Sequence, residues 1–94
     1  MLRVVVSHQF KRDYKKAVAR GLDVGKLEKV ITLLREESEL PPEYKDHRLR
    51  DDRLHKSLRE CHIQPDWLLI YRIIGDELVL FLFRTGTHGE LLEK

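Results

Sequence analysis

The hydrophobic period changes once along this chain, and that change restricts the fold more than any other feature. Between residues 7 and 34, apolar side chains recur every three to four residues, which is the period of an amphipathic helix. Between residues 58 and 84 they recur at every second residue, as in a strand. Two helices followed by a strand meander predict an α+β fold in which a helical hairpin packs on one face of a small sheet.

Local signals set the ends of the predicted elements. A β-branched run at residues 2–6 predicts a first strand, and Ser7 after it is a good helix N-cap. Gly21 ends the first helix, and Asp23 caps a second helix that cannot continue through the two prolines at 41–42. The polar segment 44–56 is predicted to be a loop. The expected order is β-α-α-β-β-β.

Turn signals predict the register of the meander. Gly75-Asp76 is typical of a two-residue type II′ turn, which puts Tyr71 opposite Leu80. A four-residue loop at 63–66 puts His62 opposite Trp67. Because side chains alternate, one face then carries Glu60, His62, Trp67 and Arg84. The other face, where the helices are expected to pack, carries Cys61, Leu68, Ile70, Phe81 and Phe83.

The composition is that of one small globular domain. The chain has 94 residues, of which 41% are hydrophobic and 36% charged, so residues 1–94 are expected to form a single domain. One cysteine excludes an internal disulfide and fits a reducing cytoplasm. The sequence shows no apolar run long enough to span a membrane and no signal-peptide pattern, so we expect a cytoplasmic location and no membrane partner.

Basic side chains gather on the first predicted helix, although the net charge is only +2. Such a cluster is either an ordinary solvated face or a surface that binds a polyanion. The helix residues concerned are Lys11, Arg12, Lys15, Lys16 and Arg20.

Histidines are the residues with the most chemical content. They are His8, His47, His55, His62 and His88. A single histidine is more often structural, but His62 has polar neighbours in the predicted register, and His88 follows Arg84 by four residues. Histidine exchanges protons near neutral pH, and arginine stabilises a phosphate oxygen. Two histidines and an arginine therefore suit metal-free RNA cleavage, and the spacing matches no compact metal-ligand motif.

Four segments together resemble the RelE superfamily of bacterial toxins, in its YafQ branch. They are residues 44–47, 59–67, 69–71 and 84–88. The resemblance covers nearly the whole chain and implies a RelE-like microbial ribonuclease fold. It also implies a toxin of a type II toxin–antitoxin pair that cuts mRNA on the ribosome, with no cofactor or metal.

The resemblance further implies roles for individual residues and partners. Catalytic roles fall to His47, His62, Asp66, Arg84 and His88. Contacts to RNA fall to Glu60, Trp67, Lys45 and the five basic residues of the first helix. The implied partners are a cognate antitoxin, the ribosome with its mRNA, and operator DNA bound through the antitoxin. The sequence departs from its relatives at Leu91-Leu92, where many carry an aromatic residue that could stack on a base.

Two other functions remain open from the sequence. One is a non-catalytic toxin of the same fold, similar to the gyrase inhibitors, and the other is a plain RNA-binding module. The gyrase-directed relatives lack this histidine set, which favours the nuclease.

Overall fold

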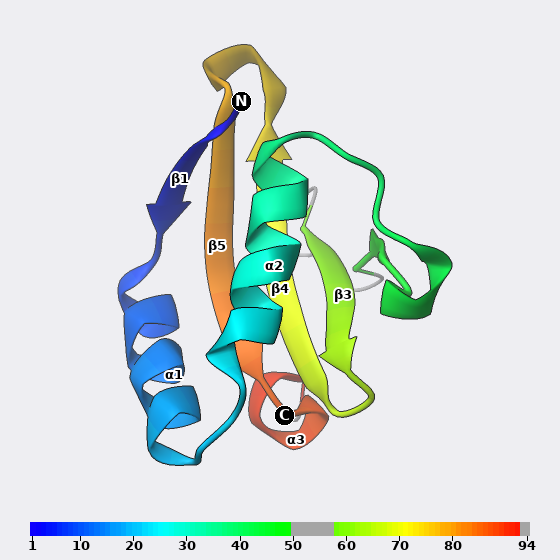
Figure 1. The fold of residues 1–94 in the computed structure, drawn as a ribbon. Helices are drawn as coiled ribbons and strands as arrows, with labels where there is room; N and C mark the ends of the chain where they lie inside the picture. Colours follow the sequence, from blue (N-terminus) through cyan, green and yellow to red (C-terminus); the bar gives the residue numbers. More distant parts are fainter. Residues whose placement is uncertain (50–57, 93–94) are drawn as a thin grey trace.

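The computed structural model forms a five-stranded sheet with two longer helices and a short one around it (Figure 1). It describes residues 1–49 and 58–92. The elements are β1 (Arg3–Val6), α1 (His8–Ala19), α2 (Val24–Arg35), η1 (Pro42–Tyr44), β2 (His47–Arg48), β3 (Arg59–Gln64), β4 (Trp67–Ile74), η2 (Gly75–Glu77), β5 (Val79–Gly86) and α3 (His88–Leu92). The α+β class and the predicted order are confirmed, with β2 as a short addition inside the predicted loop and α3 at the C-terminal end.

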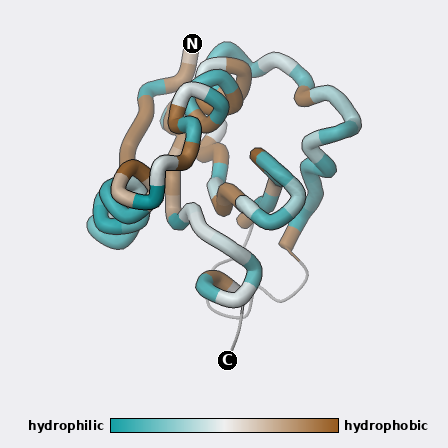
Figure 2. The backbone as a smooth tube through the Cα atoms, turned by 60° about the horizontal axis from the view of Figure 1, so that its bottom comes forward, coloured by the Kyte–Doolittle hydropathy of each residue, from teal (hydrophilic) through white to brown (hydrophobic). Residues whose placement is uncertain are grey.

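The sheet order places β5 and β4 at the centre. The order is β1-β5-β4-β3-β2, with β1 parallel to β5 and the other neighbours antiparallel. In Figure 1, α2 lies across the sheet, whereas α1 continues from β1 along the side of β5. The backbone in Figure 2 changes from brown along β1 to mostly teal along α1, as its many charged residues require.

The predicted helix ends are confirmed by their capping contacts. The Ser7 hydroxyl accepts a hydrogen bond from the Phe10 amide at 2.9 Å, and the Asp23 carboxylate accepts one from the Gly25 amide at 3.1 Å. Gly21 follows α1 with φ +79°, a left-handed conformation that glycine adopts without a steric penalty. These contacts are local in sequence, which is why the sequence predicts them.

The predicted face towards the helices is wrong for β4 and β5 and right for β3, whose Cys61 lies in the core. The β3–β4 turn has two residues, Pro65 and Asp66, and a bulge lies between His62 and Gln64. Leu69 therefore pairs with Cys61, where the prediction had Glu60. A one-residue slip turns every side chain of a strand to the opposite face.

In the corrected register, the core contains the other face of β4 and β5 and the predicted face of β3. Its strand residues are Cys61, Ile63, Trp67, Leu69, Tyr71, Leu80 and Leu82, packed against Phe10 and Ala17 of α1 and Leu27, Val30 and Leu34 of α2. By alternation, Glu60 and His62 lie on the face away from the helices, together with Leu68 and Ile70. The prediction that Glu60 and His62 point away from the helices is confirmed, while the one for Trp67 is wrong.

The β4–β5 connection is also longer than predicted. Gly75–Glu77 form a 3-10 turn, and Leu78 follows in the left-handed region with φ 55°. Tyr71 pairs with Leu82 instead of Leu80. Because this shift is by two residues, Tyr71, Leu80 and Leu82 still share one face of the sheet, as in the predicted register. A second bulge, in which β5 carries one extra residue opposite Ile70 and Tyr71, then shifts the register by one.

No helix in the described ranges is both long enough and apolar enough to span a membrane.

Candidate active site

Three histidine rings form a row on the sheet face away from the helices. The ring centroids of His47 and His62 lie 6.4 Å apart, and those of His62 and His88 lie 5.5 Å apart. The side chains of His47 and His88 are about half exposed, at 50% and 47%. Solvent, and hence a substrate, reaches the row from outside.

Each histidine comes from a different element, and the sheet brings them together. His47 opens β2 and pairs with Glu60, and His62 pairs with Leu68 on β4. Leu68 in turn pairs with Gly86 at the end of β5, two residues before His88. The order of the strands in the sheet therefore brings the three histidines together.

Asp66 holds the ring of His88. Its Oδ1 accepts hydrogen bonds from the His88 backbone amide at 3.1 Å and from His88 Nδ1 at 2.8 Å. These hydrogen bonds lower the pKa of Asp66 below its ordinary value. Because an ionised carboxylate only accepts, Nδ1 carries a hydrogen, and Nε2 is the nitrogen left to exchange a proton.

His47 is held differently, with contacts at both ring nitrogens. Nδ1 lies 2.7 Å from the Lys45 carbonyl oxygen, and Nε2 lies 3.0 Å from Glu60 Oε1. The Glu60 side chain is only 5% exposed, and its second oxygen, Oε2, is buried with no hydrogen-bond partner among the residues that the structure describes. The carboxylate lies beneath His47, and the contact between Glu60 and RNA stays a prediction.

Arg84 is bound by a buried carboxylate that the sequence analysis missed. Asp13 of α1 accepts two hydrogen bonds from the guanidinium, each 3.0 Å long, and one from the Thr85 amide at 3.1 Å. Burial alone would raise the pKa of Asp13, but the hydrogen bonds from Arg84, Gln9 and Thr85 hold it below its ordinary value. The sequence does carry one signal for this contact, because Asp13 is the single acidic residue between positions 3 and 20.

Trp67 belongs to the core and not to an RNA-binding surface. It is 3% exposed, and its Nε1 donates a hydrogen bond to Thr85 Oγ1 at 2.9 Å. That hydroxyl donates onward to the Leu68 carbonyl at 2.7 Å. The expected contact between Trp67 and RNA is corrected, because a buried ring cannot stack on a base.

Asp46 is a second carboxylate that the sequence analysis did not single out. Its side chain accepts hydrogen bonds from the Tyr71 hydroxyl and from the Arg59 guanidinium. Burial and this carboxylate raise the pKa of Tyr71. The contacts anchor the residue before His47 to two strands, so they fix where the first histidine of the row stands.

The basic residues of α1 divide into two groups. Lys16 and Arg20 form ion pairs with Glu90 of α3, and Arg12 donates a hydrogen bond to Gln9. Lys11 and Lys15 are exposed and, among the described residues, form no ion pair. Lys45 is exposed as well. His8 lies at the exposed start of α1, and His55 lies outside the described residues.

No three histidine, cysteine, aspartate or glutamate side chains in residues 1–49 and 58–92 are arranged to hold a metal ion.

Comparison with known proteins shows what this chain resembles. A family model described as the bacterial toxin YafQ of type II toxin–antitoxin systems matches residues 2–93. An mRNA interferase toxin YafQ from Escherichia coli (strain B / BL21-DE3) is 44% identical over 86 residues, which cover 90% of this chain and 89% of the relative. A putative toxin YafQ from Haemophilus influenzae is 39% identical over 94 residues, which cover 95% and 90%.

Solved structures of toxins are also similar to this chain. A metal-bound toxin from Helicobacter pylori superposes with a TM-score of 0.91 at 46% identity, covering 98% of this chain and all of that one. The DinJ–YafQ complex of E. coli contains a chain that superposes with a TM-score of 0.87 at 39% identity, with coverage of 98% and 99%.

Proposed function

The chain belongs to the YafQ family of bacterial type II toxin–antitoxin toxins, and from this premise we propose that it is an endoribonuclease that stops translation by cutting mRNA on the ribosome. We infer this activity because two curated relatives are named mRNA interferase toxin YafQ. The observation that carries the proposal is the row of three accessible histidines with Asp66 fixed on the last of them.

The chemistry is an internal transesterification of RNA. The 2′-hydroxyl loses its proton to a base and its oxygen attacks the adjacent phosphorus. The bond from phosphorus to the 5′-oxygen breaks, and an acid protonates that oxygen. The products are a 2′,3′-cyclic phosphate and a free 5′-hydroxyl.

His62 and His88 are the proposed proton-transfer pair. Their ring centroids are 5.5 Å apart in an edge-to-face arrangement, so a phosphate that lies across both rings has one ring near each of the two oxygens that change protonation. Asp66 serves this step by fixing the ring of His88 so that Nε2 faces the substrate.

Positive charge beside the pair stabilises the phosphorane. We assign this role to Arg84 and, when protonated, to His47. Arg84 lies across Ile70 from Glu60 in the sheet register, and Asp13 binds two of its nitrogens, Nε and Nη2. His47 sits over the buried Glu60 carboxylate, with Nε2 3.0 Å from Glu60 Oε1.

The proposed partners follow from the family and from the surface charge. A cognate antitoxin binds and silences the toxin; the E. coli relative YafQ has been solved in a complex with DinJ. The proposed toxin–antitoxin pair binds operator DNA through the antitoxin. Lys11 and Lys15 contact ribosomal RNA phosphates. The site of action is the cytoplasm, where mRNA is translated.

Mapping mRNA ends after incubation with translating ribosomes tests the proposal. New cuts inside codons, absent without ribosomes and suppressed by the co-expressed antitoxin, are the expected result. Intact mRNA with arrested translation would instead favour a non-catalytic inhibitor, and ribosome-independent binding without cuts would favour a plain RNA-binding module.

A further inference from the structure

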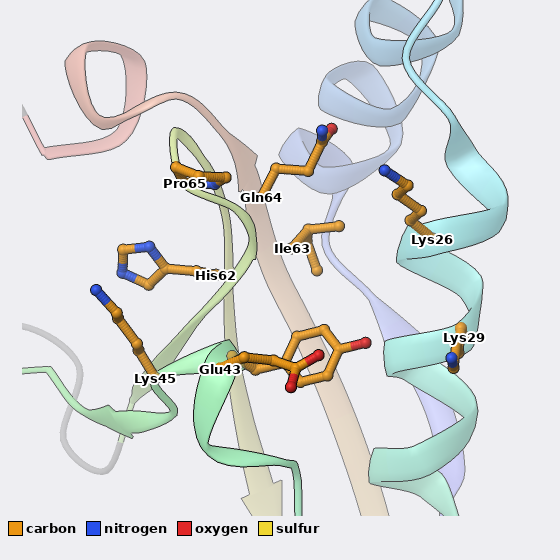
Figure 3. A pocket seen from close by; sticks show the side chains of 9 residues that line it. Lys26, Lys29, Glu43, Lys45, His62, Ile63, Gln64 and Pro65 are labelled. Carbon is orange, nitrogen blue, oxygen red and sulfur yellow. The ribbon is translucent and has the colours of Figure 1, made fainter.

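A groove of about 440 Å³ passes around the outer edge of β3, next to the histidine row. Its lining includes His62 and Lys45 on one side and Lys26 and Lys29 of α2 on the other (Figure 3). Figure 3 shows His62 and Ile63 pointing to opposite sides of β3. The groove therefore connects the face of the candidate active site with the face that the helices cover.

The short β2 strand leaves room for this groove. β2 pairs only with Arg59 and Glu60 of β3. The groove begins beyond this pairing, beside His62 and Gln64, and continues to α2. A chain that leaves His62 along the edge of β3 is thus led towards Lys26 and Lys29.

The groove carries an excess of positive charge. Three lysines line it against one carboxylate, that of Glu43. Within the part of the chain that the structure describes, none of the three lysines forms an ion pair or a side-chain hydrogen bond. Lys16 on α1, by contrast, is paired with Glu90. Lys26 and Lys29 stand at i and i+3 on α2, so their charges also repel each other in the free protein.

We propose that this groove binds the sugar-phosphate backbone of the substrate RNA on one side of the scissile phosphate, with Lys26 and Lys29 as phosphate contacts. The proposal rests on the proposed function, because His62 at one end of the groove is where the reacting phosphate lies. Ammonium groups spread along a groove fit successive phosphates better than one compact anion. Point-charge contacts of this kind add affinity without reading the base sequence.

Charge reversal on α2 tests the proposal through the salt dependence of binding. The variants are Lys26→Glu and Lys29→Glu, and Arg3→Glu on β1 is the matched control, since Arg3 is exposed and does not line the groove. The probe is a short single-stranded RNA with 2′-O-methyl groups, which cannot be cleaved by this route. Fluorescence anisotropy measures its Kd between about 0.05 and 0.3 M salt.

Each groove variant should lose one phosphate contact. For single strands the slope of log K against log[salt] changes by about 0.7 per contact, so affinity should fall about fivefold at 0.1 M salt. Arg3→Glu should keep the wild-type slope. Lys26→Gln and Lys29→Gln provide the same test by neutralisation if either reversal lowers the melting temperature.

Equal slopes for the wild type, the groove variants and Arg3→Glu would overturn the proposal. So would loss of antitoxin affinity in the groove variants with RNA binding unchanged, since the groove would then be a protein site. The measurement is independent of cleavage. A wild-type protein that binds the probe with the expected slope but leaves ribosomal mRNA intact would refute the proposed function and leave the RNA groove standing.

Discussion

Asp66 and Glu60 contact two histidines of the site from opposite environments. Asp66 is 70% exposed and binds His88 Nδ1, which leaves Nε2 for the substrate. Glu60 is buried under His47, and its Oε2 has no hydrogen-bond partner among residues 1–49 and 58–92. The exposed carboxylate fixes the ring of His88, and the buried one fixes the ring of His47.

Asp66→Asn should slow cleavage with little effect on folding. Asparagine lacks the charge that holds Nδ1–H, so the rate should fall, at most by the ~10²–10⁴-fold that a general acid or base contributes. The free energy of unfolding should change by less than about 0.5 kcal/mol, because the side chain is exposed. Cleavage rates and urea unfolding of the same preparations check both; a large loss of stability would mean that Asp66 is structural.

The pKa of the Asp66 carboxyl should respond to His88. It is lowered from 3.8 in the folded protein, so its hydrogen bond to His88 is present above pH 3.8 and is lost as the pH falls through the lower folded value. In His88→Ala the midpoint should return towards 3.8. Carboxyl carbon NMR titration measures it, and an unchanged midpoint in the variant would contradict the contact.

At the scale of secondary-structure elements, two bulges decide which residues face the core. The bulge between His62 and Gln64 sets β3 so that Cys61 points to the helices and His62 away from them. The bulge at Ile70 and Tyr71 places Thr85 beside Leu69. Both histidines that the mechanism assigns to proton transfer depend on these two irregularities for their position.

The reactivity of Cys61 tests whether this face of β3 packs against the helices. Burial raises the pKa of this thiol to about 12, so almost no thiolate is present near neutral pH in the folded chain. A thiol-reactive disulfide reagent at pH 8 should leave the native protein unmodified and label it once denatured. Fast labelling of the native protein would mean that Cys61 faces solvent and that the register is wrong.

Asp13 should link α1 to β5 in a pH-dependent way. Asp13→Asn removes the charge that binds Arg84 and Thr85, at a cost of about 1–3 kcal/mol in the free energy of unfolding. The folded pKa of Asp13 is lowered, so this stability is present above pH 3.8 and is lost as the pH falls through the folded value. Denaturant unfolding at several pH values should show the wild type and Asp13→Asn converging in acid.

Asp76→Asn is the matched control for Asp13, because Asp76 is exposed in the η2 turn. It should unfold like the wild type at every pH. A gap between the wild type and Asp13→Asn that persists in strong acid would show that the carboxylate charge is not what stabilises the α1–β5 contact.

Sequence patterns predicted the helices well because their signals are local. Ser7, Asp23 and Gly21 act within a few residues of their own position. The strand register depends on turn length and on bulges, and neither Pro65-Asp66 nor Gly75-Asp76 fixes these by residue type alone. One slip was enough to assign Trp67 to the wrong face.

The histidines of the site were predicted because their chemistry is specific, whereas their supporting carboxylates were not. Asp13 binds Arg84 from 71 positions away, and Asp46 binds Tyr71 from 25 positions away. An aspartate in a charged helix or a polar loop looks like a surface residue until the tertiary contact is known. Such contacts follow from the packing of α1 and β2 and not from any local pattern.

At the scale of the whole molecule, the lysines that form no ion pair within residues 1–49 and 58–92 lie in two separate regions. Lys11 and Lys15 are exposed on α1, and Lys26, Lys29 and Lys45 line the groove beside β3. We assign the first region to docking on the ribosome and the second to the substrate strand. Changes in one region should therefore leave the function of the other intact.

Reversing Lys11 and Lys15 to glutamate should weaken association with ribosomes. Fewer cations near ribosomal RNA reduce both the affinity and its dependence on salt. Lys16 is left unchanged because it pairs with Glu90. Co-sedimentation over a range of salt concentrations measures the effect, with Arg3→Glu as the charge control. Sedimentation equal to that of the wild type would make this face an ordinary solvated surface.

The most direct test of the account is the single-turnover cleavage rate of ribosome-bound mRNA by His62→Ala and His88→Ala. Both residues lie on the sheet face away from the helical core or at the start of α3, so both variants should melt within a few degrees of the wild type. Each should bind ribosomes normally and cleave about 10²–10⁴-fold more slowly. Wild-type cleavage rates in folded, ribosome-bound variants would contradict proton transfer by these two histidines.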